Sequence, residues 1–229
     1  MSVYDTGSLS RAQSAVLDLV PRDSDVLELG ANTGYMTTRL KGRACRVVAG
    51  EFDRAALLSL VAVADVARWC DLNNLDTLGV FEGGTYDVVV LADVLEHLVD
   101  PEQVLRWCRT RLRPGGIVIV SMPNIANWRV RLLLARGRWD MTETGILDRT
   151  HLRFYTLASA GALFERAGYT VAAQVPCVQG LPVLTKAARC FSSGSVVGAV
   201  ERRLGTKLVE ARPTVFAYQT VWVLHARNK

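Results

Sequence analysis

A glycine-containing loop and two later carboxylates have the spacing of a nucleotide-binding site. The apolar segment VLEL, residues 26–29, leads directly into the loop GANTG, residues 30–34. A loop between a strand and a helix presents backbone N–H groups and a helix N-terminus to a ligand. Glu51 follows Gly30 by 21 residues, where a carboxylate can accept hydrogen bonds from both hydroxyls of a ribose. Asp71 would follow the third strand, where it can accept a hydrogen bond from the amino group of an adenine.

The loop lacks the complete G-x-G-x-x-G pattern. Asn32 stands where the middle glycine would be, although asparagine adopts the left-handed conformation more readily than most residues. Taken one at a time, Glu28 and Glu51 could equally be ordinary carboxylates at strand ends. Nucleotide binding therefore depends on the elements that would bring these groups together.

Strand-like and helix-like segments alternate along the chain. Helical spacing and end signals predict helices over residues 10–20, from the loop to about residue 40, and over 101–112 and 157–167. Apolar runs predict strands at residues 25–29, 45–52, 86–94, 115–123, 169–175 and 214–226, and residues 55–69 are apolar nearly throughout. This alternation predicts an α/β fold with a doubly wound, mostly parallel sheet.

Five segments in order resemble the motifs of class I S-adenosylmethionine-dependent methyltransferases. They are VLELGANTGY, VVAGEFD, CDLNNLD, YDVVVLADVLEHLVDPEQVL and LRPGGIVIVSMPN, and the match spans about residues 24–175. The later stretch GRWDMTETGILDRTHLRFYT is similar to one bacterial branch associated with saccharide, cell-surface polymer and natural-product pathways. The resemblance implies a Rossmann-like sheet of seven strands with an antiparallel last strand. It also implies S-adenosylmethionine as cofactor and S-adenosylhomocysteine as product.

The resemblance gives roles to the residues of these motifs. The implied cofactor contacts are Glu28 orienting the loop and the methionine portion, Gly30, Asn32 and Gly34 passing beneath it, Glu51 on the ribose, Phe52 on the adenine face, Asp71 and Leu72 at the adenine edge, and Ala92 and Asp93 on the methionine side. Phe52 could instead belong to the core.

Transfer of a methyl group to a hydroxyl requires a base, and histidine is the side chain best suited to that task near neutral pH. His97 would begin the helix after the fourth strand, at the sheet edge where acceptors bind. His151 lies in an arginine-rich segment that would fold over the same edge. We treat the two as equal candidates, with the alternatives that His97 hydrogen-bonds the helix start and that His151 fixes a loop. His225, in the last predicted strand, is interpreted as structural.

Residues 124–155 are predicted to form the acceptor side of the site. Six arginines and three acidic residues fall between positions 129 and 153. Arginines such as Arg149 and Arg153 could bind a phosphate or carboxylate of the acceptor, or could form a solvated face of salt bridges. Asn124 could donate to the acceptor or make a turn. Asp148 or Arg149 is close enough in sequence to orient His151.

A helical insertion is expected before the last strand. We expect a single domain over residues 1–229, with the insertion at residues 177–212. Val196, Val197, Val200 and Leu204 have the spacing of an amphipathic helix within it. This helix could act as a lid, a homodimer contact or a docking surface for a partner.

Composition narrows the functional classes. Half of the 229 residues are hydrophobic and the formal net charge is +5, which fits a folded globular protein. We find neither a membrane-span pattern nor a signal-peptide layout, and so expect a cytoplasmic protein. The five cysteines lie far apart, and the histidines and carboxylates show no tight ligand spacing, so no metal site is predicted.

The leading hypothesis is methylation of a hydroxyl on a saccharide or natural-product intermediate, which could be anionic. N-methylation of a small amine is the nearest alternative. Nucleic-acid methylation is disfavoured because basic clusters with interleaved aromatics are missing from the sequence. A catalytically silent cofactor-binding scaffold is the alternative from another class.

Overall fold

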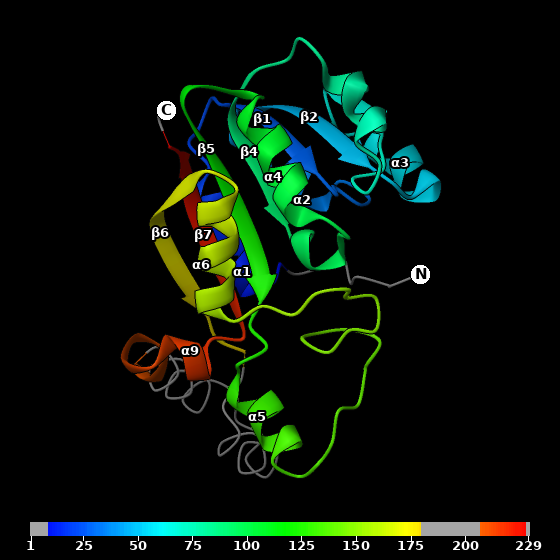
Figure 1. The fold of residues 1–229 in the computed structure, drawn as a ribbon. Helices are drawn as coiled ribbons and strands as arrows, with labels where there is room; N and C mark the ends of the chain where they lie inside the picture. The colour runs from blue at the N-terminus through cyan, green and yellow to red at the C-terminus, as the bar shows by residue number, and fades with distance from the viewer. Residues whose placement is uncertain (1–8, 180–206, 228–229) are drawn as a thin grey trace, which may run out of the picture.

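A mixed sheet forms the centre of the molecule (Figure 1). The computed structural model describes residues 9–179 and 207–227. Within these residues the sheet has seven strands in the order β3-β2-β1-β4-β5-β7-β6. The strands are β1 (Asp25–Leu29), β2 (Arg46–Glu51), β3 (Val66–Trp69), β4 (Tyr86–Ala92), β5 (Leu112–Pro123), β6 (Tyr169–Cys177) and β7 (Gln219–Ala226).

The strand directions confirm the predicted fold class. β1 pairs in parallel with β2 and β4, β2 with β3, and β4 with β5. The last strand, β7, is antiparallel to both β5 and β6. The chain order reverses between β1 and β4, which is the position where open α/β sheets bind ligands at the carboxyl ends of their strands.

Helices cover both faces of the sheet. One face packs on α1 (Arg11–Leu19), α2 (Tyr35–Lys41) and α3 (Arg54–Leu60), and the other on α4 (Pro101–Arg109), α6 (Leu157–Arg166) and the 3-10 helix η1 (Leu75–Phe81). Figure 1 shows α4 and α6 on the near side of the sheet. α1 starts as predicted, because Ser10 and Gln13 form a reciprocal capping box.

Burial on both faces explains why β4 has an unbroken apolar run. Val88 and Val90 pack into the core beneath α1 and α2, whereas Val89 and Leu91 pack into the core beneath α4 and α6. Successive side chains of a strand point to opposite faces. A central parallel strand therefore needs apolar residues at every position.

The chain differs from the sequence predictions at three places. Residues 214–216, expected to begin the last strand, belong to the short helix α9 (Pro213–Phe216), and β7 starts only at Gln219. The apolar stretch 55–69 contains α3 from its second residue onward and the whole of β3. His97 does not begin a helix: it ends the short 3-10 helix η2 (Leu95–His97), and α4 starts only at Pro101. The physical reason is that the Asp100 carboxylate accepts a hydrogen bond from the N–H of Gln103 and caps the helix, so the first helical residue lies four residues after His97.

The segment after β5 extends beyond the sheet. Figure 1 shows α5 (Trp128–Leu134) and the chain that follows it beyond the carboxyl end of β5. Of the predicted insertion, residue 177 belongs to β6, residues 207–211 are helical, and the short helix α9 (Pro213–Phe216) precedes β7. The amphipathic helix predicted around residues 196–204 lies outside the described residues. In the described part of the chain, no helix is both long enough and apolar enough to cross a membrane.

Candidate active site

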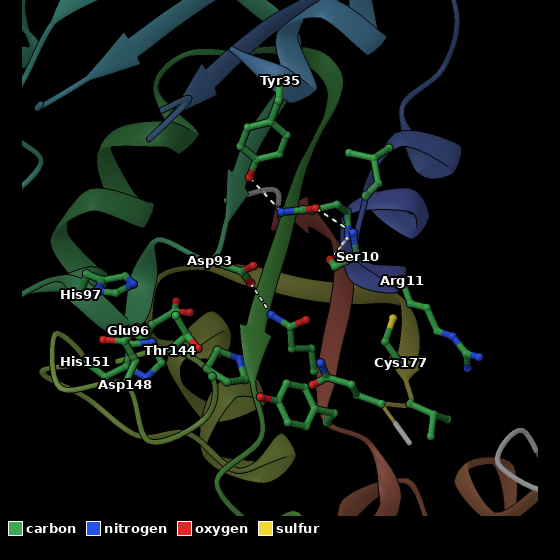
Figure 2. Close-up of a pocket in the computed structure, with 18 of the residues that line it drawn as sticks. Ser10, Arg11, Tyr35, Asp93, Glu96, His97, Thr144, Asp148, His151 and Cys177 are labelled. Carbon is green, nitrogen blue, oxygen red and sulfur yellow. Dashed lines mark hydrogen bonds between the residues drawn. The ribbon is translucent and has the colours of Figure 1, made fainter. Parts of the chain in front are cut away.

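A cavity of about 800 Å³ opens at the carboxyl ends of β1 and β4 (Figure 2). Its wall combines the start of α1, the loop before α2, η2, the segment after α5, and the chain on either side of the β6–β7 pair. The residues that line it include Arg11, Thr33, Gly34, Arg39, Asp93, Glu96, His97, Asp148, His151 and Gln219.

The loop after β1 takes the backbone conformation that its residue types allow. Gly30, Asn32 and Gly34 all have positive φ angles, of 72°, 51° and 86°. A Cβ at Gly34 would lie 2.4 Å from a methyl group of Val63. Asn32 therefore supplies the left-handed residue for which a glycine would otherwise be needed.

Glu51 holds this loop at the end of β2. Its carboxylate accepts hydrogen bonds from the backbone N–H groups of Asn32 and Asp53, both at 2.7 Å. A carboxylate has about four acceptor positions. Two of them are left for a ligand, which is what the predicted ribose contact requires.

The remaining predicted nucleotide contacts lie along the same edge. Asp71 follows β3, and its Oδ1 accepts the N–H of Asn73, while Leu72 is buried. Phe52 is 62% exposed with its ring 6.2 Å from that of Trp69. This exposure excludes the alternative that Phe52 is a core residue and leaves its face available for stacking.

The strand order fits an extended ligand. Four adjacent strands, β3, β2, β1 and β4, carry at their carboxyl ends Asp71, Glu51, the loop and Asp93, respectively. Neighbouring strands are about 4.8 Å apart, so the four positions span roughly 14 Å. An adenine, a ribose and an amino-acid portion can occupy them in that order, and these residues therefore fit S-adenosylmethionine.

One carboxyl group, on β1, is buried, and a second, just after β4, is half-buried at the cavity wall. Glu28 is 3% exposed and accepts a 2.6 Å hydrogen bond from the Thr37 hydroxyl. Its burial raises the pKa to about 7. Asp93 has a φ of 56°, and the Ser121 hydroxyl and Gln219 amide donate to its carboxylate at 2.7 and 3.0 Å. Burial raises the pKa of Asp93 as well.

The two histidines proposed as bases are brought together. The ring centroids of His97 and His151 are 4.8 Å apart at an interplanar angle of 72°. Nδ1 of His151 is 3.1 Å from the carbonyl oxygen of Ile146, and Nδ1 of His97 is 3.2 Å from the carbonyl oxygen of Thr150. The Thr150 hydroxyl is also 3.2 Å from Nδ1 of His97, but it donates its hydrogen to Asp148. Because a carbonyl only accepts, a neutral ring at either position carries its hydrogen on Nδ1 and has its lone pair on Nε2. Burial, together with the neighbouring His97, lowers the pKa of His151.

Glu96 completes this group and was not singled out from the sequence. Its side chain is 1% exposed, and Oε2 has no hydrogen-bond partner. Burial and the nearby Asp93 raise its pKa well above the ordinary value. One ligand atom from each of Glu96, His97 and His151 lies within 4.8 Å of the others. No metal site was expected, because the histidines and carboxylates are not closely spaced in the sequence. The fold nevertheless brings Glu96, His97 and His151 together as a group that could hold a metal ion.

The predicted substrate-binding residues make contacts within the protein. Asn124 is 1% exposed, and its amide donates to the carbonyls of Thr214 and Ala217. Arg149 pairs with Glu143 at 2.8 Å. Arg153 donates to the backbone carbonyls of Leu98 and Val99. These side chains do not line the cavity, because backbone carbonyls and a surface carboxylate satisfy them first.

Other residues line the cavity and orient His151. Arg11 and Arg39 line the cavity instead. The Asp148 carboxylate accepts from the N–H and hydroxyl of Thr150, so the Ile146 carbonyl, rather than Asp148 or Arg149, orients the His151 ring.

The fold and the edge residues define an α/β enzyme domain built for a nucleoside-containing cofactor. A sequence model of the methyltransferase-domain family matches residues 6–174, so the chain belongs to this family and is a class I S-adenosylmethionine-dependent methyltransferase domain.

Known proteins support the assignment. A protein of Mycolicibacterium smegmatis, described as a probable S-adenosylmethionine-dependent methyltransferase, is 31% identical over 182 residues, which cover 78% of this chain and 64% of that protein. A ubiquinone biosynthesis O-methyltransferase of Aeromonas salmonicida is 38% identical over 89 residues, covering 38% of this chain and 36% of that protein. The chain thus spans less than two thirds of either relative. A methyltransferase structure from Archaeoglobus fulgidus, at 15% identity, matches the fold with a TM-score of 0.64 over 94% of this chain and 92% of its own.

Proposed function

We propose that the protein transfers the methyl group of S-adenosylmethionine to a hydroxyl oxygen of a small biosynthetic acceptor, such as a saccharide or natural-product intermediate. One observation carries this proposal. The cavity lined by the loop residues Thr33 and Gly34 is also lined by two histidines, and in their neutral rings Nε2 carries a lone pair and no hydrogen. The ubiquinone-pathway relatives are O-methyltransferases by name.

The bound cofactor supplies a methyl group on a positively charged sulfur, which is already a good leaving group. The chain's own task is to position the acceptor and remove its proton. Glu51 and Asp71 hold the nucleoside half, and the loop and Asp93 border the end that carries the methyl group. The Glu96–His97–His151 group lies where the acceptor hydroxyl would lose its proton. A hydroxyl needs such a group to lose its proton, whereas an uncharged amine already has a lone pair available for the methyl group.

N-methylation is the second candidate, and the acidic lining favours it. Asp93, Glu96 and Asp148 all face the cavity, where they could hold a cationic amine.

Three other properties remain predictions: location in the cytoplasm, assembly as a homodimer, and an anionic acceptor.

Calorimetric titration with S-adenosylhomocysteine tests the cofactor site. Replacing Glu51 by alanine removes two hydrogen bonds to a charged group and should weaken binding by at least about 100-fold. The matched control is Glu82→Ala, an exposed glutamate after η1, and its affinity should equal that of the wild type. Lack of binding by the wild type would overturn the proposal.

Transfer of labelled methyl groups into pools of small molecules then tests the acceptor class. We expect label in hydroxyl-bearing compounds. Label confined to amines would replace the O-methylation proposal by N-methylation.

A further inference from the structure

The cluster of Glu96, His97 and His151 has the composition of a metal site. Two imidazoles and one carboxylate, with open positions toward a cavity, are a common ligand set for zinc and similar divalent transition metals. The ligand atoms lie within 4.8 Å of one another. In a tetrahedral zinc site they would be about 3.3 Å apart, so modest side-chain rotation closes the gap.

The burial of the Glu96 carboxylate is a second, independent observation that points to a ligand. The side chain is 1% exposed and its Oε2 has no hydrogen-bond partner. None of the salt bridges formed within residues 9–179 and 207–227 includes Glu96, Asp93 or Asp148. Among the described residues, these three carboxyl groups border one cavity without an ion pair to arginine or lysine. Asp93 and Asp148 have hydrogen-bond donors, whereas Oε2 of Glu96 has none, and a buried acceptor atom left unpaired is costly.

The histidines are already oriented as metal ligands. Each Nδ1 donates to a backbone carbonyl, of Ile146 for His151 and of Thr150 for His97. Metal-binding histidines almost always donate their other ring N–H in this way, because it fixes the tautomer and the ring plane. Figure 2 shows the Glu96 and His151 side chains close together, with His97 beside them and Asp93 on the far side of Glu96.

We infer that Glu96, His97 and His151 bind one divalent transition-metal ion of the zinc type, and that this ion binds the acceptor oxygen. The second half of the inference rests on the proposed O-methylation.

With the ion bound, both imidazoles are ligands, so the ion, and not a histidine base, promotes loss of the acceptor proton. The acceptor hydroxyl coordinates the ion, which lowers its pKa, and its proton leaves to solvent water. A lone pair of the resulting oxygen forms a bond to the methyl carbon while the carbon–sulfur bond breaks. Its electron pair stays on sulfur, giving uncharged S-adenosylhomocysteine and the methyl ether. Both imidazoles remain neutral ligands throughout.

Metal binding is measured first, because it does not depend on activity. The full chain, without an added histidine tag, is stripped with chelator and titrated with Zn²⁺ by calorimetry and with Co²⁺ by visible absorption. We expect one ion per chain. Glu96→Gln and His151→Asn should each weaken binding at least about 10-fold, whereas His225→Asn, which changes the histidine on β7, should not.

The outcomes separate this inference from the proposed function. Glu96→Gln keeps the shape of the side chain, and circular dichroism with S-adenosylhomocysteine titration confirms that each variant is folded. If the wild type binds neither ion, or if the three variants bind equally, the metal site is overturned. If chelated protein still transfers methyl groups at the wild-type rate, the metal role is overturned while O-methylation stands. If the ion binds and label enters amines alone, the metal site stands while O-methylation and the ion's role in it fail.

Discussion

The buried Glu28 carboxyl should make the stability of the protein depend on pH in a defined direction. Its pKa is about 7 in the folded chain against an ordinary 4.5. Because the folded-state pKa is the higher one, the folded state binds more protons between these values. The stabilisation is complete below pH 4.5 and is lost as the pH rises through 7. At about 1.4 kcal/mol per pKa unit, ionised Glu28 costs the fold about 3 kcal/mol.

Replacing Glu28 by glutamine removes this cost. The glutamine oxygen can still accept the Thr37 hydroxyl, and any cost of burying its amide N–H₂ does not change with pH. The free energy of unfolding of Glu28→Gln relative to wild type should therefore increase by about 2 kcal/mol between pH 5.5 and pH 8. Urea unfolding followed by circular dichroism at the two pH values measures this change.

The matched control is the exposed glutamate variant Glu82→Gln, which should show no comparable change. Equal pH dependence of the two variants would refute the reasoning, because it would mean that ionisation of Glu28 does not destabilise the folded state. A decrease in relative stability for Glu28→Gln toward pH 8 would mean that a partner stabilises the ionised form.

Two further substitutions test the loop and the acceptor side. Gly34→Ala and Gly83→Ala both place a side chain at positive φ, but at Gly34 the new Cβ would lie 2.4 Å from Val63, whereas nothing lies within 4 Å at Gly83. Gly34→Ala should therefore be less stable than Gly83→Ala by about 1–3 kcal/mol in urea unfolding, and equal losses would contradict the close packing of the loop. Asn124→Ala should cost about 2 kcal/mol of stability and leave S-adenosylhomocysteine affinity unchanged; unchanged stability with altered acceptor preference would restore Asn124 to the substrate site.

The gathering of the proposed cofactor residues at one sheet edge could be predicted from the sequence because its signals are local. The loop, Glu51 and Asp71 each lie at or just after the end of a strand, and a parallel sheet brings strand ends to one edge. Asn32 departs from the glycine pattern, yet its residue type already allowed the left-handed conformation found here. The fold class could be predicted for the same reason, since an unbroken, β-branched apolar run such as that of β4 is typical of a strand buried on both faces.

The acceptor side could not be predicted as well because it depends on contacts between distant loops. His97 and His151 meet because the backbone N–H groups of Leu152 and Arg153 donate to the Glu96 carbonyl. Loop conformations of this kind leave no periodic pattern in the sequence. The charge of Arg153 suggested a ligand, but the guanidinium instead satisfies the carbonyls of the chain after η2.

Glu96 was overlooked although the sequence shows it beside His97. Adjacent residues of a regular helix point in different directions, so the pair did not suggest a shared site. The 3-10 turn η2, which ends before the cap of α4, brings both side chains to the cavity wall.

The central claim is that one cavity joins the cofactor's reactive sulfur to the Glu96–His97–His151 group. A crystal structure with S-adenosylhomocysteine bound tests it most directly. We predict ribose hydroxyls on Glu51, the adenine against Phe52, and the sulfur opening toward His97 and His151. A ligand bound elsewhere, or a sulfur facing away from these histidines, would contradict the account.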